Sequence, residues 1–190
     1  RMFRGEFEMT EKQPVPYSEG PVYMRTGFEP FMDVPAAFNA DGNKMENFSG
    51  SVKENMKVQH NGVKSVQLQG KAKGAGSYAS CPILGGQDIA ITAGTKLRYY
   101  IYGDSAAATQ SMLDIVATDG SRLSEQPGAE EYIGTCAGAS FGKEGEWTRV
   151  VVDVGRFMAG KTIQSVNLLF KGEEEADVNV YVDDVMIFTA

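Results

Sequence analysis

The sequence predicts an all-β fold, a two-sheet antiparallel β-sandwich, and three observations support this class. From residue 21 onward, short stretches rich in β-branched and aromatic residues alternate with clusters of Gly, Asn, Asp and Ser. No long stretch places apolar residues at the 3.6-residue period of an amphipathic helix. The predicted strands also recur at fairly regular spacing, which is typical of a sandwich.

Four segments have the strongest strand pattern. They are residues 96–102, 112–118, 165–171 and 178–188. Because successive side chains of a strand point to opposite faces, the first segment carries Arg98, Tyr100 and Tyr102 on its non-core side. Weaker strands are predicted at residues 65–70, 87–91 and 148–154.

The chain length fits one β-sandwich domain, which we assign to residues 21–190 of the 190. Residues 1–20 contain scattered Glu and Pro with little periodicity, so we expect a linker or an extended N-terminal arm there. Residues 4–9 are predicted to form a short strand within this arm.

Composition and charge narrow the classes of function. A chain with 42% hydrophobic and 23% charged residues is globular, and no apolar run approaches the roughly 18 residues of a membrane helix. With 18 basic and 25 acidic side chains the net charge is −7, which repels phosphate backbones. We therefore expect no nucleic-acid partner and no membrane insertion, and neutral or weakly polar ligands fit better.

The two cysteines, Cys81 and Cys136, leave the redox state open. Either they form a disulfide or they are two free thiols, because pairing depends on a Cα separation that a sequence does not contain. The chain begins without a charged-then-apolar leader, so any secretion signal was removed or lay upstream in a longer parent. We expect a module of a larger secreted protein.

Three motifs follow one another in residues 22–190. Residues 26–30 read Thr-Gly-Phe-Glu-Pro, residues 145–154 read Gly-Glu-Trp-Thr-Arg-Val-Val-Val-Asp-Val with Ile-Gln-Ser-Val-Asn-Leu at 163–168, and residues 180–188 read Val-Tyr-Val-Asp-Asp-Val-Met-Ile-Phe. Their order and spacing resemble carbohydrate-binding modules of the jelly-roll, galactose-binding-like superfamily. The resemblance implies a jelly-roll sandwich and a core position for Trp147.

The resemblance also implies a structural calcium ion between the first and last strands. Carried over by position, Glu29 supplies one carboxylate and Asp183 or Asp184 another, with backbone carbonyls completing the hard oxygen shell that calcium prefers. Adjacent residues of a regular strand point to opposite faces, so Asp183 and Asp184 cannot both point inward if the strand is regular. An inward carboxylate must be compensated, and a hydrogen-bonded or ion-paired carboxylate is the alternative to a metal.

Glycan recognition without catalysis needs aromatic rings that stack on sugars, with polar groups nearby. The non-core sides of the strong strands offer such a set if these strands share one sheet. The predicted ligand-binding residues are Arg98, Tyr100, Tyr102, Met112, Asp114, Asn167 and Lys171. Alternatively the tyrosines pack under a loop, and the site lies in loops at Tyr78 or at Tyr132 beside Glu130 and Glu131.

Residues for the common catalytic centres are scarce. The sole histidine, His60, precedes the hairpin-turn signal Asn61-Gly62 and is expected at a strand end on the surface. No Gly-x-Ser-x-Gly motif occurs, ligands for zinc are few, and residues 74–76 lack the remainder of a dinucleotide or phosphate loop. We therefore predict no catalytic residues and no nucleotide cofactor.

The sequence thus predicts a non-catalytic module that binds polysaccharide or oligosaccharide. Its expected partners are a glycan and the linked catalytic domain of a secreted or cell-surface glycan-degrading protein. Two alternatives stay open: a structural or protein-binding adhesion module, and a jelly-roll glycosidase or polysaccharide lyase that uses two carboxylates. The first alternative predicts no exposed aromatic strip, and the second predicts two close carboxylates in a groove.

Overall fold

The computed structural model describes residues 22–30, 33–129 and 141–189, and ten strands account for most of them. The strands are β1 (Val22–Thr26), β2 (Lys44–Glu46), β3 (Phe48–Asn55), β4 (Ser65–Lys73), β5 (Ser77–Gly85), β6 (Thr95–Gly103), β7 (Ser111–Ala117), β8 (Thr148–Val152), β9 (Ile163–Gly172) and β10 (Glu175–Thr189). The helical elements placed within these residues are α2 (Val154–Met158) and the 3-10 turns η3 (Ala40–Gly42), η4 (Ala107–Thr109) and η5 (Leu123–Glu125).

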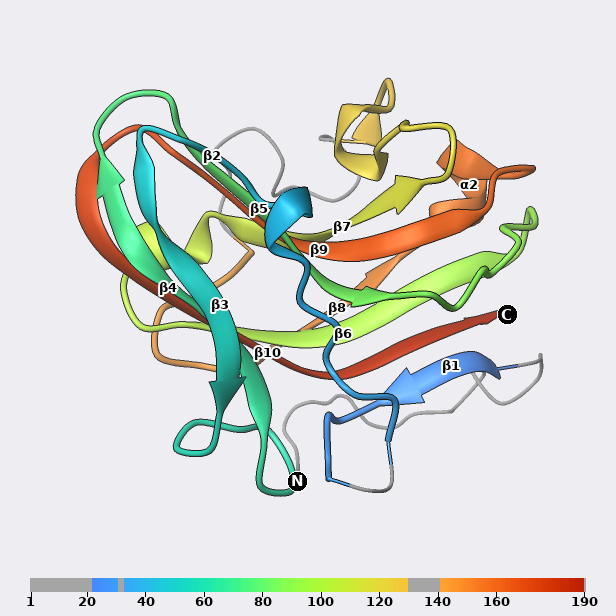
Figure 1. Cartoon of the computed structure of the whole chain (residues 1–190), viewed down its shortest axis with the longest axis horizontal. Helices are drawn as coiled ribbons and strands as arrows, with labels where there is room; N and C mark the ends of the chain where they lie inside the picture. Colours follow the sequence, from blue (N-terminus) through green and yellow to red (C-terminus); the bar gives the residue numbers. More distant parts are fainter. Residues whose placement is uncertain (1–21, 31–32, 130–140, 190) are drawn as a thin grey trace.

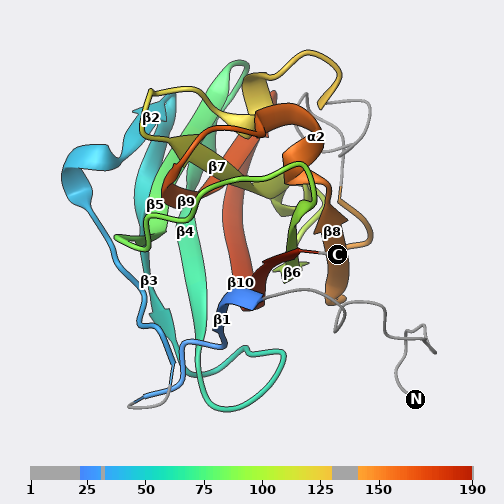
Figure 2. The same cartoon turned by 90° about the vertical axis from the view of Figure 1, so that its right-hand side faces the viewer.

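The strands form two antiparallel sheets packed face to face, which confirms the predicted β-sandwich (Figure 1). The six-stranded sheet has the order β3-β4-β10-β6-β8, with β1 pairing along β10, and the four-stranded sheet has the order β2-β5-β9-β7. Strands β3 and β8 lie at opposite edges of the larger sheet (Figure 2). No helix in the described part of the chain is long and apolar enough to cross a membrane.

Most of the predicted strands are confirmed. Strands β6, β7, β9 and β10 match the four strongest predictions, and β4 and β8 match two of the weaker ones. The strand predicted at residues 87–91 is wrong, because this segment forms only an isolated bridge from Ala90 to Thr162. Gly86 (φ 72°) and Asp88 (φ 50°) have left-handed backbone there, which interrupts an extended strand.

Several predictions concern residues outside the described ranges. They are the N-terminal arm at residues 1–20, its strand at 4–9, the cysteine Cys136, and the loop residues Glu130, Glu131 and Tyr132. Cys81 lies buried in β5, and this burial raises the pKa of its thiol to about 11. A high thiol pKa keeps Cys81 protonated and unreactive at neutral pH.

The core fills the space between the two sheets. It consists of the inward-facing residues, which alternate along the strands of both sheets. Among them are Leu97, Tyr99, Ile101, Leu113, Ile115, Val166, Leu168 and Phe170. Phe170 of β9 contacts Phe48 of β3 with ring centroids 5.5 Å apart, so this aromatic pair joins the two sheets. The predicted alternation of the strong strands is therefore confirmed on their inward sides.

The longest strand, β10, changes one of its neighbours partway along its length. Residues 175–182 pair with β4, whereas residues 185–188 pair with β1. The pairing of β10 with β6 shifts in register between Asp183 and Met186. Asp183 lies opposite Tyr100, and Met186 lies opposite Arg98. Three steps on β10 thus match two on β6, which is a β-bulge with one extra residue.

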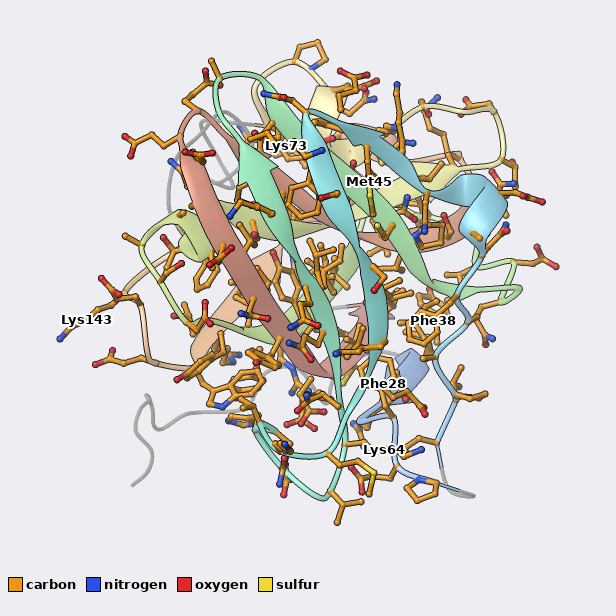
Figure 3. All side chains as sticks on the ribbon, turned by 60° about the vertical axis from the view of Figure 1, so that its left-hand side comes forward. Phe28, Phe38, Met45, Lys64, Lys73 and Lys143 are labelled. Carbon is orange, nitrogen blue, oxygen red and sulfur yellow. The ribbon has the colours of Figure 1, made fainter. Side chains whose placement is uncertain are left out.

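Truncating the aromatic pair between the sheets should weaken the fold. Phe170 is 1% exposed, so Phe170→Ala is expected to lower the free energy of unfolding by about 3–5 kcal/mol through lost burial and the cavity it leaves. Phe38, which precedes β2 and is 41% exposed, provides the control (Figure 3). Urea unfolding should show a change of at most about 0.5 kcal/mol for Phe38→Ala. Equal losses for both variants would contradict the assigned core.

Candidate functional site

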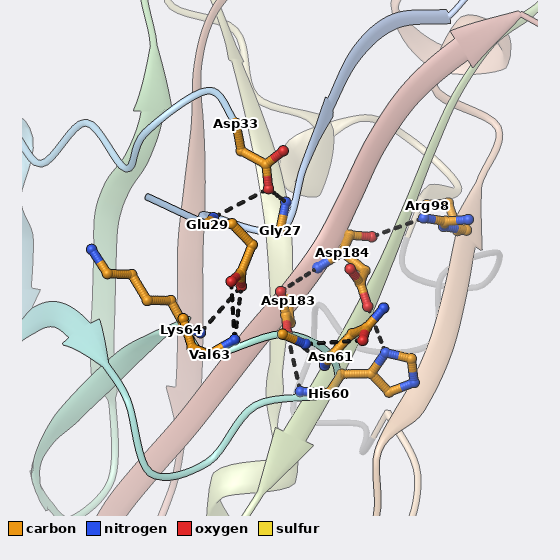
Figure 4. A network of polar contacts seen from close by, with 11 residues as sticks. Gly27, Glu29, Asp33, His60, Asn61, Val63, Lys64, Arg98, Asp183 and Asp184 are labelled. Atoms are coloured by element: carbon orange, nitrogen blue, oxygen red, sulfur yellow. Dashed lines mark hydrogen bonds and ion pairs between the residues drawn. The ribbon is translucent and has the colours of Figure 1, made fainter. Parts of the chain in front are cut away.

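The β-bulge in β10 places two carboxylates at the centre of a hydrogen-bond network (Figure 4). Asp183 is fully buried, and its Oδ2 accepts the backbone N–H groups of His60 (3.0 Å) and Asn61 (3.1 Å). Its Oδ1 accepts the N–H of Asp184 at 2.8 Å. The loop 56–64 between β3 and β4 is thereby attached to β10.

Two further carboxylates hold the same region. Glu29 accepts the N–H groups of Val63 (3.0 Å) and Lys64 (3.2 Å), and Asp33 accepts those of Gly27 (2.8 Å) and Glu29 (3.1 Å) (Figure 4). We call Glu29, Asp33, Asp183 and Asp184 the carboxylate cluster. Backbone N–H groups compensate much of its negative charge, which agrees with the hydrogen-bonded alternative considered for these acids.

The bulge explains how adjacent aspartates serve one site. Asp184 has a left-handed backbone with φ 51°, an uncommon conformation for a residue other than glycine. Its Oδ2 lies 2.5 Å from His60 Nδ1, and its carbonyl accepts a hydrogen bond from Arg98 Nη2 at 3.1 Å. Adjacent residues point to opposite faces only in a regular strand, and β10 is irregular at this point. Asp183 and Asp184 can therefore both serve one site.

Glycine is required where the loop meets Glu29. Gly62 has φ 67°, and a Cβ atom there would lie 2.4 Å from the Glu29 carboxylate. The Asn61-Gly62 turn signal therefore marks a real turn whose backbone approaches an acid closely. His60 lies on the surface as predicted, but in the middle of the loop between β3 and β4 and not at a strand end.

Burial makes Asp183 unusually hard to ionise. The low-polarity surroundings raise its pKa to about 7, and the nearby charge of Asp184 adds to this effect. The hydrogen bonds that it accepts from three backbone N–H groups lower its pKa and so partly oppose this effect. Burial therefore outweighs these hydrogen bonds, and Asp183 is more readily protonated than an exposed aspartate.

The carboxylate cluster fits a calcium ion in its chemistry but not as a completed shell. One oxygen each from Asp33, Asp183 and Asp184 lies within 3.5 Å of the point where a Cβ on Gly27 would sit. Calcium prefers such oxygen ligands at about 2.3–2.6 Å. Across residues 22–30, 33–129 and 141–189, no three acidic, histidine or cysteine side chains surround a common ion position. Calcium at Glu29, Asp183 and Asp184 stays a prediction.

Aromatic side chains gather on the outward side of the six-stranded sheet, next to this network. We call His60, Tyr100, Tyr102, Trp147 and Tyr181 the aromatic cluster. His60 stacks on Tyr100, with ring centroids 3.9 Å apart and an interplanar angle of 16°, and meets Trp147 edge-on at 5.5 Å. Tyr102 contacts Trp147 at 5.5 Å and Tyr181 at 5.8 Å. Tyr100, Tyr102 and Trp147 are half-buried, so parts of their rings face solvent.

A row of amides crosses the same face beside the aromatic cluster. Asn55 donates to Gln67 (2.9 Å), Gln67 donates to Asn179 (2.8 Å), and Asn179 donates to Asp104 (2.9 Å). Gln67 also donates to the Tyr181 hydroxyl at 3.3 Å, which joins the two groups. We call Asn55, Gln67, Asn179 and Asp104 the amide row. Figure 3 shows how side chains stand outward from the strands of this sheet.

The predicted ligand-binding residues do not lie on one sheet. Arg98, Tyr100 and Tyr102 belong to β6 of the six-stranded sheet, whereas Met112, Asp114, Asn167 and Lys171 belong to β7 and β9 of the four-stranded sheet. The expectation that these strands share a sheet is wrong, because β6 pairs with β10 and β8 while β7 pairs with β9. Whether any of these residues binds a ligand stays a prediction.

The residues of the four-stranded sheet are mostly occupied in packing. Met112 and Asp114 are fully buried, and the Asp114 carboxylate accepts the Ser124 N–H (2.8 Å) and hydroxyl (2.6 Å). Asn167, 2% exposed, donates to Ser80 at 3.1 Å. Lys171 is exposed. Met112, Asp114 and Asn167 thus have structural roles that sequence alternation did not reveal.

The three predicted residues of β6 also differ from one another. Arg98 braces the bulge through the Asp184 carbonyl and lies 5.6 Å from the Tyr100 ring, and burial lowers the pKa of its guanidinium. Tyr100 is covered by His60. Within the described residues, the nearest rings to Tyr102 are those of Trp147 and Tyr181, with centroids 5.5 Å and 5.8 Å away. Tyr102 is therefore the predicted residue best placed to meet a ligand.

Two members of the aromatic cluster were missed. Trp147 was expected in the core, but it is half-buried at the start of edge strand β8 and packs against His60 and Tyr102. His60 was treated only as a surface turn residue. The loop candidate Tyr78 lies within β5 on the four-stranded sheet, not in a loop. Only the hairpin signal after His60 hinted at its place.

Comparisons with known proteins support the fold. No protein-family profile matches the chain, and no curated protein sequence matches it. Among solved structures, a carbohydrate-binding module of the β-sandwich superfamily has a TM-score of 0.55 at 15% identity over 80% of this chain. The glycoside hydrolase domain of Endo-D from Streptococcus pneumoniae R6 has a TM-score of 0.53 at 20% identity over 76%, and SGBP-B from a xyloglucan utilization locus in Bacteroides uniformis has 0.50 at 7% over 88%.

The chain corresponds to only part of these proteins. It spans 21% of the Endo-D structure, 61% of the carbohydrate-binding module structure and 50% of SGBP-B. At these identities the likeness establishes the jelly-roll sandwich and no more.

The raised pKa of Asp183 makes stability depend on pH. Its folded value of about 7 exceeds the unfolded value of about 3.9, so the folded state binds the proton more tightly. This stabilisation is fully present below about pH 4 and is lost as pH rises through 7. With a calcium chelator present, urea unfolding should show stability falling from pH 5 to pH 8, by at most about 1.4 kcal/mol per pH unit.

The variant Asp183→Asn tests the assignment of this pH dependence. The amide keeps an acceptor oxygen but does not titrate, so the slope between pH 5 and pH 8 should flatten. An unchanged slope in this variant would assign the pH dependence to other groups.

Proposed function

We propose that this chain binds glycan, without catalysis of its own, on the outward side of the six-stranded sheet. The observation that carries the proposal is the half-buried pair Tyr102 and Trp147 lying beside the amide row. Sugar rings present apolar faces that stack on aromatic rings, and their hydroxyls pair with amides and carboxylates. A face with both features side by side suits a carbohydrate.

The site is held rigidly, which favours binding. Its amides are ordered by hydrogen bonds to one another, and its rings are ordered by mutual contacts. Ordering these groups before a ligand arrives reduces the entropy lost on association. Binding therefore needs few contacts to be specific.

The acids near the face support a non-catalytic role. Glycosidases place two carboxylates on either side of the scissile bond. Here Asp184 is paired with His60, Asp104 accepts from Asn179, and Asp183 is buried under backbone N–H groups. These acids serve the architecture of the face.

We place the chain as an accessory module of a secreted or cell-surface glycan-degrading protein. A site built on few rings gives modest affinity, which becomes useful when a linker raises the local concentration of a catalytic domain on its substrate. Similar folds occur in carbohydrate-binding modules and in a glycoside hydrolase domain, which agrees with this placement.

Glycan binding should depend on the aromatic cluster of the six-stranded sheet. Tyr102→Ala and Trp147→Ala are each expected to weaken binding about tenfold or more, because each removes a stacking surface. The matched control is Tyr78→Ala, which removes a half-buried tyrosine from the opposite sheet.

Titration calorimetry on the best ligand from a screen of soluble glycans would measure these effects. Melting temperatures and reducing ends should be recorded on the same samples. Loss of binding in Tyr78→Ala alone would move the site to the other sheet, and release of reducing ends would make the chain an enzyme.

We also propose that the carboxylate cluster holds a structural calcium ion. Asp183 and Asp184 would supply carboxylate oxygens together with Glu29 or Asp33, and the ion would favour the charged form of Asp183, which burial and the nearby Asp184 disfavour. The ion would strengthen the attachment of the loop 56–64 and the turn at Gly27 to β10.

Calcium should therefore stabilise the fold. Removing it with a chelator at pH 7.5 is expected to lower the melting temperature by several degrees, since binding to the folded state adds stability by mass action. Restoring calcium, but not magnesium, should reverse the shift. Asp183→Asn should remove the response, and an identical melting temperature with and without calcium in the wild type would refute the proposal.

A further inference from the structure

We infer that His60 is a positioning residue of the glycan-binding face: its ring, held between Asp184 and Tyr100, makes the loop 56–64 one wall of the face. This inference rests on the proposed function. It also assigns Tyr100 a supporting role, in which the tyrosine acts through His60 and does not itself stack on a sugar.

The stacking of His60 on Tyr100 carries the first step. Ring centroids 3.9 Å apart at an angle of 16° are in direct face-to-face contact, so the imidazole covers that side of the tyrosine. A sugar cannot occupy the same side of Tyr100 while His60 is in place. The rings that remain available are those of Tyr102 and Trp147.

The position of the imidazole is fixed from two other directions. Its Nδ1 lies 2.5 Å from Asp184 Oδ2, and its ring meets Trp147 edge-on with centroids 5.5 Å apart. Asp184 is itself set by the β-bulge and by the bond from Arg98 to its carbonyl. The orientation of Trp147 is therefore linked to the carboxylate cluster through one side chain.

The loop stays attached when the imidazole is removed. Its tethers are backbone N–H groups: those of His60 and Asn61 bind Asp183, and those of Val63 and Lys64 bind Glu29. A side-chain substitution at His60 leaves all of these donors intact. The variants are thus expected to fold, and their effects report on the ring.

Three variants of His60 separate the ring from its hydrogen bond. His60→Ala removes both, His60→Asn keeps a polar group that can reach Asp184, and His60→Phe keeps a ring that can stack on Tyr100. The control is Met56→Ala, in the same loop, where the side chain is 67% exposed. We expect glycan binding to weaken about 5- to 10-fold in His60→Ala and His60→Asn, and to stay within about twofold in His60→Phe and Met56→Ala.

A second readout needs no glycan. Trp147 is the sole tryptophan of the chain, so fluorescence excited selectively in tryptophan, and not in the eight tyrosines, reports on this face. Acrylamide should quench this fluorescence more strongly in His60→Ala and His60→Asn than in the wild type, because the covering ring is gone. His60→Phe and Met56→Ala should match the wild type.

The outcomes separate the two proposals. If the wild type binds a glycan and His60→Ala binds it equally well, the inference about His60 is wrong and the proposed function stands. If His60→Phe loses as much affinity as His60→Ala, the ring is not what positions the site, and the inference is also wrong. If the wild type binds no glycan, the proposed function fails, and unchanged acrylamide quenching in His60→Ala would then overturn the placement of His60 as well.

Discussion

Two adjacent carboxylates at a bulge in the longest strand must be compensated, and the surrounding structure follows from that requirement. Asp183 is fully buried, so leaving it without partners would be costly. Its oxygens accept backbone N–H groups from the loop 56–64 and from Asp184, and Asp33 accepts the N–H of Gly27 in the same way. The loop 56–64 and the residues after β1 are thus held by hydrogen bonds from their backbone N–H groups to carboxylates.

This arrangement ties the architecture to the face that we propose for glycan binding. The contacts of His60 with β10 join residues more than 120 positions apart, and the same imidazole lies against the rings of Tyr100 and Trp147. A change at the buried acids would therefore reach the exposed rings through a few rigid contacts. Stability and recognition are coupled at this point of the molecule.

Local patterns predicted six of the ten strands in the described residues and missed β1, β2, β3 and β5. The confirmed ones include residues 96–102 and 165–171, where side-chain alternation depends only on neighbouring residues. Sheet membership was not predictable in this way, since the pairing of β6 with β10 joins segments about 80 residues apart. Trp147 was misplaced because the resemblance implied a core position, whereas the residue lies just before the edge strand β8 and is only half-buried. The role of His60 depends on contacts between residues far apart in the sequence. The only local sign of its position was the turn signal Asn61-Gly62.

The bulge in β10 also changes the phase of the strand. Before it, the core residues are even-numbered (Val178, Val180 and Val182), and after it they are odd-numbered (Val185 and Ile187). Odd-numbered residues therefore point outward in the first half, as Asn179 and Tyr181 do, and inward in the second half, which pairs with β1. Deleting one residue at the bulge would give both halves one regular alternation with the same core residues inward, but it would remove the irregular backbone that brings Asp183 and Asp184 to one site. Substitutions in either half leave this change of phase in place, whereas a deletion at the junction would remove it.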